Sequence, residues 1–211
     1  MQRLTSVRMG FSCYQTGGHE GEMMNQKALF LDRDGTINVE KDYLYKIEDF
    51  EFSQGAVEAL RAAQKAGYKL IVITNQSGIA RGYYTMRDFE TLNHWMLEQL
   101  SSQGVYIDKV YLCPHLPDAS VPEYRRDCDC RKPKTGLFEL AIREFDLDAS
   151  ACCAVGDKIR DCCICEITDC RGILIGHNEK QEIIDSVKAG AFRNVVYAES
   201  LVDAVDMLIN T

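Results

Sequence analysis

Short, almost wholly apolar runs recur along the chain and are separated by longer mixed segments. Six runs are predicted as strands, over residues 28–32, 70–74, 105–112, 152–155, 173–175 and 195–197. Their apolar residues are continuous rather than alternating with polar ones, which is typical of strands buried on both faces of a sheet. The pattern therefore favours a central sheet that is covered on two sides.

Between these runs, apolar side chains recur every three or four residues, which is the spacing of one face of a helix. Helices are predicted from residue 56 to Gly67, from Thr85 to about Gly104, over 137–145, and from Ser200 onward. The longest apolar stripe is interpreted as core packing rather than as a cofactor site, and it comprises Phe89, Leu92, Trp95, Met96 and Leu100.

The alternation of strands and helices predicts an α/β fold with a doubly wound, mostly parallel sheet and helices on both faces. No internal repeat, low-complexity tract or linker divides residues 27–211, which are predicted to form one domain with a loop insertion at 113–130. Residues 1–26 lack periodicity and are expected to be a disordered leader, an expression-vector remnant or the result of an upstream start. A docked N-terminal arm is the alternative.

Composition excludes several classes of protein. Apolar residues make up 46% of the chain, enough for a large core, and the net charge of -8 argues against a general nucleic-acid binder. A phosphate substrate would still need a local basic pocket. The chain contains no run of about 18 apolar residues, so no membrane span is predicted, and no signal peptide is recognisable. Ten cysteines without such a signal indicate a reducing cytoplasm rather than a disulfide-bonded secreted protein.

The first predicted strand ends in two carboxylates, Asp32 and Asp34, followed by Gly35 and Thr36. Residues two apart in an extended chain point to the same side, and glycine lets the backbone turn sharply after them. Two neighbouring carboxylates repel each other unless a cation lies between them, and Mg²⁺ prefers such hard oxygen ligands. The alternative is a strand-to-turn segment with solvated aspartates.

Polar residues also follow the other predicted strands, where sites form in open α/β sheets. Thr74 ends the second strand and could hold phosphoryl oxygens. Lys132 precedes a predicted helix and could neutralise a phosphoryl group. Asp157 follows the fourth strand, and one turn of helix would bring Asp161 to the same side, which completes a plausible Mg²⁺ site. Each signal alone also fits an ordinary solvated turn.

The loop insertion carries four residues with metal-ligand spacing, Cys113, His115, Cys128 and Cys130. Three thiolates and one imidazole make a closed tetrahedral zinc set, which leaves no position for an activating water. The loop has little apolar content, so a metal would order it. We therefore predict a structural zinc that positions the following Arg131 and Lys132.

The remaining cysteines are interpreted as small core residues rather than as a second metal or redox site. Two lie in a predicted buried strand and four cluster after Asp161; they are Cys152, Cys153, Cys162, Cys163, Cys165 and Cys170. Cys13 lies in the leader and is given no role.

This order of motifs resembles the haloacid dehalogenase-like phosphatases over nearly all of residues 27–211. The resemblance implies that Asp32 is the nucleophile and a Mg²⁺ ligand, and that Asp34 is the general acid and base and binds Mg²⁺ through its carbonyl. It also implies that Thr74 and Lys132 stabilise the phosphoryl group and that Asp157 binds Mg²⁺. No insertion is long enough to form a large cap domain.

Within the superfamily, segments 31–38, 74–82, 113–133 and 155–158 resemble the heptose 1,7-bisphosphate 7-phosphatases. The resemblance implies removal of the C7 phosphate in nucleotide-activated heptose synthesis for bacterial surface glycans such as lipopolysaccharide. It implies substrate contacts from Glu40, Lys41, Asp42, Tyr43, Thr74, Asn75, Gln76, Ser77, Arg131, Lys132 and Lys158. We expect a monomer that binds a small phosphorylated sugar and neither nucleic acid nor membrane.

Three alternatives remain open at this point. Histidinol-phosphate phosphatases share the nucleophile and a similar zinc loop, although segment 77–82 favours the heptose family. A polynucleotide 3′-phosphatase would need a basic groove, which the net charge of -8 disfavours. A non-catalytic, zinc-stapled binding module would normally have lost the nucleophile or a metal ligand. The pattern does not choose the anomer at C1.

Overall fold

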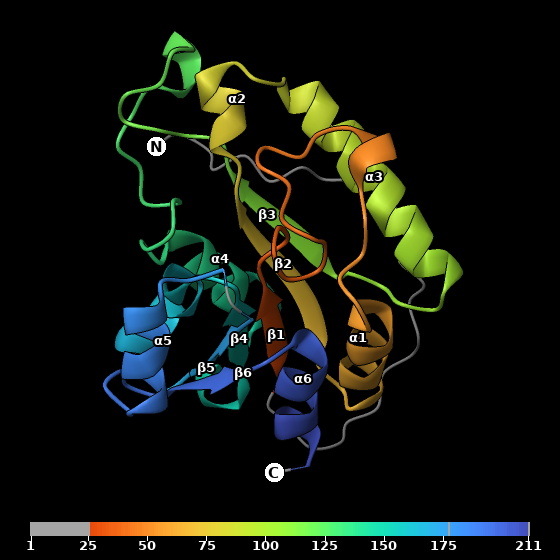
Figure 1. Cartoon of the computed structure of the whole chain (residues 1–211), viewed down its shortest axis with the longest axis vertical. Helices are drawn as coiled ribbons and strands as arrows, with labels where there is room; N and C mark the ends of the chain where they lie inside the picture. The colour runs from red at the N-terminus through yellow and green to blue at the C-terminus, as the bar shows by residue number, and fades with distance from the viewer. Residues whose placement is uncertain (1–25, 177, 211) are drawn as a thin grey trace.

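A computed structural model describes residues 26–176 and 178–210, and its centre is one six-stranded sheet in the order β3-β2-β1-β4-β5-β6 (Figure 1). All five pairings between neighbouring strands are parallel. The strands are β1 (Ala28–Leu31), β2 (Lys69–Asn75), β3 (Lys109–Cys113), β4 (Cys153–Gly156), β5 (Arg171–Ile175) and β6 (Val195–Ala198). The predicted α/β class is confirmed.

The helices that connect the strands cover both faces of the sheet, as Figure 1 shows for α4 and α5 on one side and α1, α3 and α6 on the other. They are α1 (Ala56–Lys65), α2 (Ser77–Arg81), α3 (Met86–Ser102), α4 (Gly136–Phe145), α5 (Gln181–Lys188) and α6 (Leu201–Ile209). Short 3-10 helices occur at η1 (Ile47–Asp49), η2 (Pro122–Tyr124), η3 (Ala149–Ala151) and η4 (Ile159–Glu166).

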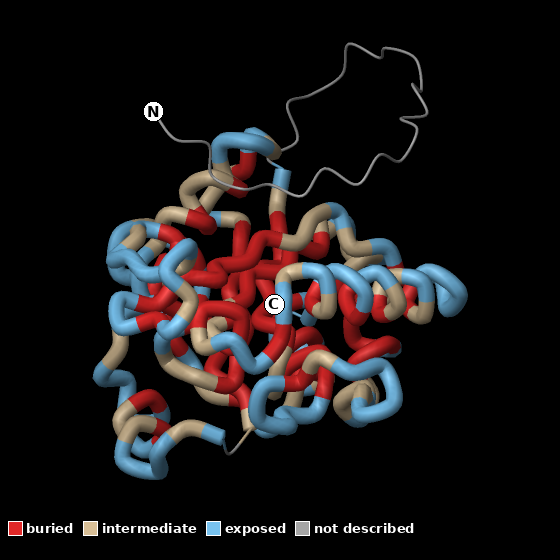
Figure 2. Tube along the Cα trace, turned by 90° about the horizontal axis from the view of Figure 1, so that it is seen from above, coloured by how far each residue is buried: buried red, intermediate tan, exposed pale blue. Residues whose placement is uncertain are grey.

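Alternate residues of β1 enter two separate apolar cores. Phe30 packs with Phe138 of α4 in one core, at a ring-centroid distance of 5.3 Å. Leu29 and Leu31 pack with helices α1, α3 and α6 in the other core. Both faces of the central strand are thus buried, as its continuous apolar run predicts. Figure 2 shows this buried interior surrounded by more exposed helices.

Most predicted boundaries are confirmed to within a few residues. Ser200 caps α6, and Thr85 caps α3 by accepting a hydrogen bond from Asp88 N while the Asp88 side chain accepts from Thr85 N. This reciprocal pair satisfies two backbone N–H groups that a helix start otherwise leaves unpaired.

The predicted strand over 105–112 is partly wrong, because the observed strand is β3 (Lys109–Cys113). Residues 105–108 are instead a connection after α3. The amide of Val105 donates to Leu100 O at the end of α3, and Asp108 N donates to Leu70 O. Val105 is fully buried, so its apolar character reflects packing in the core rather than strand pairing.

Helices α2 and α5 and the 3-10 helix η4 were not predicted. Helix α5 buries Ile184 and Val187, whose spacing of three is a helical signal too short to identify the element. Residues 159–166 form a 3-10 helix rather than the expected turn of α-helix.

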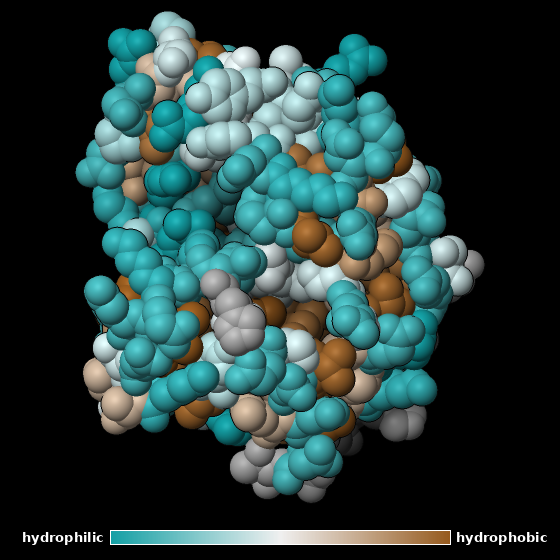
Figure 3. All heavy atoms as spheres, in the orientation of Figure 1, coloured by the Kyte–Doolittle hydropathy of each residue, from teal (hydrophilic) through white to brown (hydrophobic). Residues whose placement is uncertain are grey.

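The described chain starts at Gln26, whose carbonyl accepts a hydrogen bond from Asp148 N. Of the predicted leader over residues 1–26, residues 1–25, with Cys13 among them, lie outside the described residues. Among the described helices, none combines the length and apolar character needed to cross a bilayer. The face of the molecule shown in Figure 3 is mainly hydrophilic, with apolar side chains scattered across it.

Candidate active site and metal centre

The carboxyl ends of three adjacent strands bring the predicted catalytic residues together. Asp32 follows β1, Thr74 lies near the end of β2, and Asp157 follows β4. Strand β1 lies between β2 and β4. The chain passes from β1 to β2 and β3 on one side, and later returns to form β4 on the other side of β1. Such a switch point is where open α/β sheets form their sites. All three side chains are buried.

Lys132 reaches this point from the loop before α4 and is also buried. Its Nζ donates to Asp32 Oδ1 at 2.9 Å and to Ile73 O at 2.6 Å, and it lies 2.7 Å from Asp161 Oδ1. Burial by itself would lower the pKa of Lys132, but Asp161 and Asp32 reverse this effect and raise it. The ammonium group is therefore a permanent positive charge beside the predicted nucleophile.

Asn75 holds the backbone of this loop in place. Its Nδ2 donates to Lys132 O at 3.0 Å, and its Oδ1 accepts from Lys132 N at 3.1 Å. Asn75 was predicted as a substrate contact. The structure places its side-chain amide against the Lys132 backbone. Asn75 therefore joins the end of β2 to the loop that carries Lys132.

Three carboxylates, those of Asp32, Asp157 and Asp161, offer oxygens that lie within 4.8 Å of one another. Burial, partly offset by Lys132, and the neighbouring Asp161 and Asp157 raise the pKa of Asp32 to about 7. Burial and Asp161 raise the pKa of Asp157 to about 6. These shifts have one physical origin, an excess of buried negative charge that a single lysine does not balance.

The chemistry of this site fits a hard divalent cation. The Oδ2 atom of Asp157 is buried and has no hydrogen-bond partner among the described residues. Gly35, at φ +77°, leaves the space beside it open, because a Cβ there would lie 2.3 Å from Asp157 Oδ2. Oxygen ligands and an unpaired carboxylate atom are the conditions in which Mg²⁺ binds.

Asp161 differs from the other two carboxylates because one of its oxygens accepts a backbone hydrogen bond and the other, which has no hydrogen-bond partner among the described residues, makes a close ion pair with a lysine. Its Oδ1 lies beside Lys132 Nζ, and its Oδ2 accepts from Lys158 N at 3.0 Å. Asp161 therefore orients Lys132 and the start of η4. This leaves Asp32 and Asp157 as the side chains that could hold Mg²⁺, with the predicted backbone contribution of Asp34 beside them.

The carboxylate of Asp34 is not part of this group of three and is held by a network of donors. Arg33 donates from Nη2 at 2.9 Å to Asp34 Oδ1, and Asn38 Nδ2 donates to the same atom at 3.1 Å. Gln76 Nε2 donates to Asp34 Oδ2 at 2.8 Å. Arg33 is 1% exposed and lies over the ring of Phe89, so this cation belongs to the site rather than to the surface.

The predicted substrate segment 40–43 lies at the solvent edge of the site. Glu40 is exposed, but neighbouring atoms of the site remove part of the water around its carboxyl group. This desolvation, together with the charges of Asp34 and Asp157, raises the pKa of Glu40 to about 7. Tyr43 adopts the left-handed conformation at φ 61° and packs edge-on against Tyr83, with ring centroids 4.7 Å apart. Segments before and after β2 thus meet at this edge.

The other predicted substrate contacts are spread around the same end of the sheet. Ser77 is the first residue of α2, and Lys158 directly follows the Asp157 carboxylate. Arg131 lies between the cysteine-rich loop and Lys132, and its Nη1 donates to His115 O at 3.5 Å. The loop that carries the thiols is therefore in contact with a predicted substrate-binding residue.

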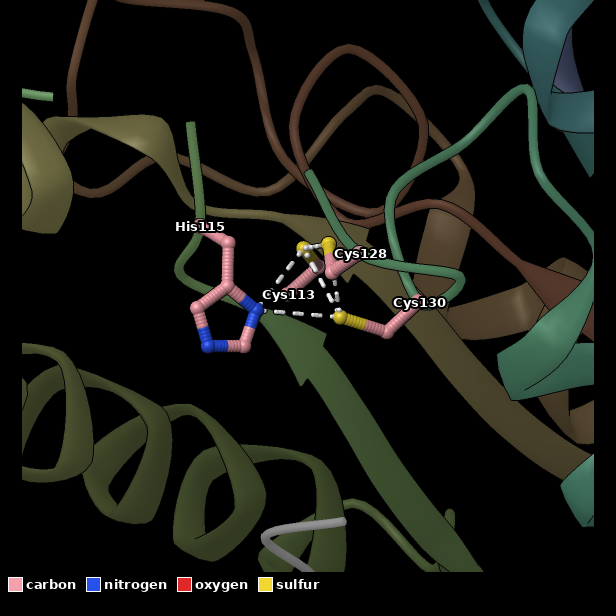
Figure 4. Close-up of side chains that lie close together, drawn as sticks. All are labelled: Cys113, His115, Cys128 and Cys130. Carbon is pink, nitrogen blue, oxygen red and sulfur yellow. Dashed lines mark hydrogen bonds between the residues drawn. The ribbon is translucent and has the colours of Figure 1, made fainter. Parts of the chain in front are cut away.

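The four predicted zinc ligands converge in the loop that follows β3 (Figure 4). The Sγ atoms of Cys113 and Cys128 lie 3.5 Å apart, and Cys130 Sγ lies 3.2 Å from each of them. His115 Nδ1 lies 3.1 Å from Cys130 Sγ. Zn–S bonds of about 2.3 Å in a tetrahedron imply ligand separations slightly below 4 Å. Both the donor set and its spacing fit a zinc ion.

The six described cysteines outside this loop are buried core residues, as predicted. Cys153 lies in the core on the α1 side of the sheet, and the other five lie in the core on the α4 side: Cys152, Cys162, Cys163, Cys165 and Cys170. Burial raises the pKa of the Cys152 thiol to about 11 and that of Cys163 to about 12, so both are neutral near pH 7.

Several site residues escaped prediction from the sequence. Arg33 lies between the two aspartates and Asn38 follows the motif, and both resemble ordinary turn residues until the fold directs them onto Asp34. The side chain of Asn178, in the loop after β5, lies beside the Asp157 carboxylate and opposes the rise of its pKa. Tyr84 donates its hydroxyl to Gln76 Oε1. The only available signal was their position shortly after apolar strands or beside a recognised motif.

The chain is similar in sequence to several described relatives. One from Haemophilus ducreyi, a "D-glycero-beta-D-manno-heptose-1,7-bisphosphate 7-phosphatase", is 47% identical over 139 residues, which cover 65% of this chain and 76% of the relative. One from Escherichia coli K12 with the same description is 49% identical over 134 residues, 64% of this chain and 70% of the relative.

Solved structures show the same fold. The D,D-heptose 1,7-bisphosphate phosphatase from B. bronchiseptica, complexed with magnesium and phosphate, superposes with a TM-score of 0.74 at 26% identity and covers 88% of this chain and 98% of its own. A HAD-like phosphatase from Mesorhizobium loti gives 0.70 at 31% identity, covering 92% and 91%.

Family models match most of the chain. The model for haloacid dehalogenase-like hydrolases matches residues 8–162, and a second model for HAD-like hydrolases matches residues 129–204. The first match alone spans well over half of the 211 residues. This chain belongs to the haloacid dehalogenase-like hydrolase family.

Proposed function

We propose that the protein is a magnesium-dependent phosphatase that removes the C7 phosphate of D-glycero-β-D-manno-heptose 1,7-bisphosphate and leaves heptose 1-phosphate. The observation that supports this most strongly is the buried contact of Asp32 with Lys132, at 2.9 Å, beside the unpaired Oδ2 of Asp157. The β anomer and the C7 position follow from relatives at 47–50% identity that carry this description.

In the first half of the reaction, a carboxylate oxygen of Asp32 attacks the phosphorus of the C7 phosphate. The new bond joins Asp32 to phosphorus, and the bond between phosphorus and the sugar oxygen breaks. Asp34 donates a proton to the departing alkoxide, which leaves as the C7 hydroxyl. Lys132 and the Thr74 hydroxyl stabilise the negative charge of the phosphoryl oxygens.

In the second half, water attacks the phosphorus of the aspartyl phosphate. Asp34 is now a carboxylate and accepts the proton of this water, while the bond between Asp32 and phosphorus breaks and inorganic phosphate leaves. Magnesium bound by Asp32 and Asp157 would supply positive charge that keeps the buried carboxylates ionised and draws the phosphoryl oxygens toward Asp32.

The Cys113, His115, Cys128 and Cys130 loop holds a structural zinc in this proposal. All four ligands come from the protein, so the ion has no open position for chemistry. Its role is to order the loop that carries Arg131 and Lys132. None of the nine described cysteines forms a disulfide bond, which fits a reducing cytoplasm. We also propose that the protein acts as a monomer in the synthesis of lipopolysaccharide heptose.

The test is phosphate release in the presence of Mg²⁺ from both anomers of heptose 1,7-bisphosphate, beside histidinol phosphate. We expect a clear preference, in kcat/KM, for the β anomer of the heptose substrate. A preference for histidinol phosphate would overturn the substrate while keeping the nucleophile. Absence of turnover with every phosphate ester tried would overturn the catalytic function and favour a binding module.

A further inference from the structure

The side chain of Gln76 lies between the predicted catalytic groups of Asp34 and Thr74 and is buried, with 2% of its surface exposed. Its Nε2 donates to Asp34 Oδ2 at 2.8 Å and to Thr74 Oγ1 at 2.8 Å. An amide nitrogen has two hydrogens, and both are used within the protein. No N–H of this side chain is left to donate to a substrate, although Gln76 lies in a segment predicted to contact one.

The direction of these hydrogen bonds has a chemical consequence for Thr74. Because Gln76 donates to Thr74 Oγ1, the hydroxyl accepts there and keeps its own hydrogen for another acceptor. In the proposed reaction that acceptor is a phosphoryl oxygen. While Asp34 is ionised, reversing the amide would place Gln76 Oε1 against its carboxylate, two acceptors without a hydrogen between them. It would also leave the Thr74 hydroxyl to donate to Gln76 instead.

Tyr84 secures the amide in the productive direction from the other side. Its buried hydroxyl donates to Gln76 Oε1. The ring lies so close to Gly78 that a Cβ on this glycine would be 2.1 Å from Tyr84 Cε1, and its other face stacks on Tyr45 at 5.4 Å. Burial raises the pKa of the Tyr84 phenol, so it remains a donor at neutral pH.

We propose that Gln76 is a positioning residue that orients Asp34 as general acid and sets the Thr74 hydroxyl to donate, and that Tyr84 holds Gln76 in that orientation. The inference rests on the proposed function, because it assigns Gln76 through the roles of Asp34 and Thr74. It differs from a substrate-binding role, which would need a free donor on Gln76.

The test compares two substrates with different leaving groups. A sugar alkoxide leaves poorly and depends on general acid catalysis, whereas the phenolate of p-nitrophenyl phosphate leaves without it. For Gln76→Leu we expect kcat/KM for heptose bisphosphate to fall about 10²-fold, the lower range for a general acid. For p-nitrophenyl phosphate we expect a fall of roughly tenfold, the worth of one hydrogen bond at Thr74.

Controls separate positioning from folding. Gln76→Glu keeps the side-chain size and places a carboxylate against Asp34, so the same selective loss is expected even if Gln76→Leu does not fold. Tyr84→Phe should give a several-fold loss in the same direction. Tyr45→Phe keeps the stacked ring and removes a hydroxyl outside this network, so it should match the wild type. Circular dichroism checks the fold of each variant.

Three results would overturn the proposal: equal losses on both substrates, no loss, or a raised KM with unchanged kcat, which would make Gln76 a substrate contact. Asp34→Asn, measured alongside, must show the same selective loss, otherwise the general acid is misassigned and the proposal falls with it. If the wild type does not hydrolyse heptose bisphosphate, the proposed substrate fails separately, and an alkyl phosphate that it does hydrolyse replaces it in the comparison.

Discussion

The two candidate metal centres of this chain are built in opposite ways. The thiol and imidazole ligands come from one loop of 18 residues, all within 113–130, and together they make a closed set. The carboxylates come from the ends of β1 and β4, which are more than 120 residues apart in the chain. One centre orders a local segment, whereas the other depends on the assembled sheet.

The two centres also differ in how their charges are balanced. At the sheet edge, Lys132 lies among buried carboxylates, and one carboxylate oxygen of Asp157 has no partner among the described residues. Such a site is under electrostatic strain until a cation binds. The cysteine loop would use all four of its ligands on one ion. A structural metal centre therefore leaves no coordination position open, whereas a catalytic centre keeps positions open for substrate.

The largest effect should come from Asp32→Asn, because the amide cannot form the aspartyl phosphate. We expect kcat to fall by at least about 10³-fold, as for removal of other catalytic nucleophiles. The zinc content, measured by a colorimetric chelator after denaturation, should stay equal to that of the wild type. Normal turnover by this variant would contradict the assignment of the nucleophile.

Breaking the cysteine loop should mainly affect stability. Cys130→Ser is expected to lose zinc and to lower the free energy of unfolding by about 4 kcal/mol or more, the range for loss of a metal site. Activity should fall as well, because Arg131 and Lys132 follow this ligand directly. Cys163→Ser, at a buried free cysteine outside the loop, is the matched control and should retain zinc. Equal zinc contents in the two variants would refute the predicted ligand set.

The carboxylate centre should reveal itself through pH when Mg²⁺ is dialysed away. The pKa values of Asp32 and Asp157 are raised to about 7 and about 6 in the folded protein, so the folded state holds protons that the unfolded chain has already released. These groups therefore reduce stability as the pH rises from about 4 to 7. Mg²⁺ should raise the melting temperature by several degrees at pH 8 and much less at pH 5.

Asp157→Asn sharpens this experiment by removing one of the repelling charges. Without Mg²⁺, the variant should be more stable than the wild type at pH 8 in thermal unfolding, whereas the stabilisation by Mg²⁺ should largely disappear. A variant that is less stable at pH 8 and still responds to Mg²⁺ would show that Asp157 is not under the electrostatic strain described here.

The smallest effect is expected at Asn178, whose side chain lies beside the Asp157 carboxylate in the loop after β5 and opposes the rise of its pKa. Asn178→Ala should weaken Mg²⁺ binding about tenfold, as for other residues that orient a metal ligand. Calorimetric titration with Mg²⁺ measures this directly. Gln181→Ala, on the surface at the start of α5, is the control. Unchanged affinity would mean that the Asp157 carboxylate is positioned without Asn178.

The sequence by itself determined the fold class, the two aspartates at the end of the first strand and the cysteine loop. Each of these depends on short-range pattern: continuous apolar runs predict buried strands, and metal ligands two residues apart converge without help from the rest of the chain. The resemblance of whole segments then identified the family, which the comparisons confirm.

Only the tertiary structure decided which polar residues contact one another in the site. Lys132 lies on Asp32 and Asp161 because the sheet brings together three distant loops, and nothing local distinguishes it from a solvated lysine. Likewise, Gln76 sits in a segment predicted to contact substrate, but the fold turns its amide onto Asp34 and Thr74. Hydrogen bonds are short and directional, so their partners depend on three-dimensional placement that a linear pattern does not contain.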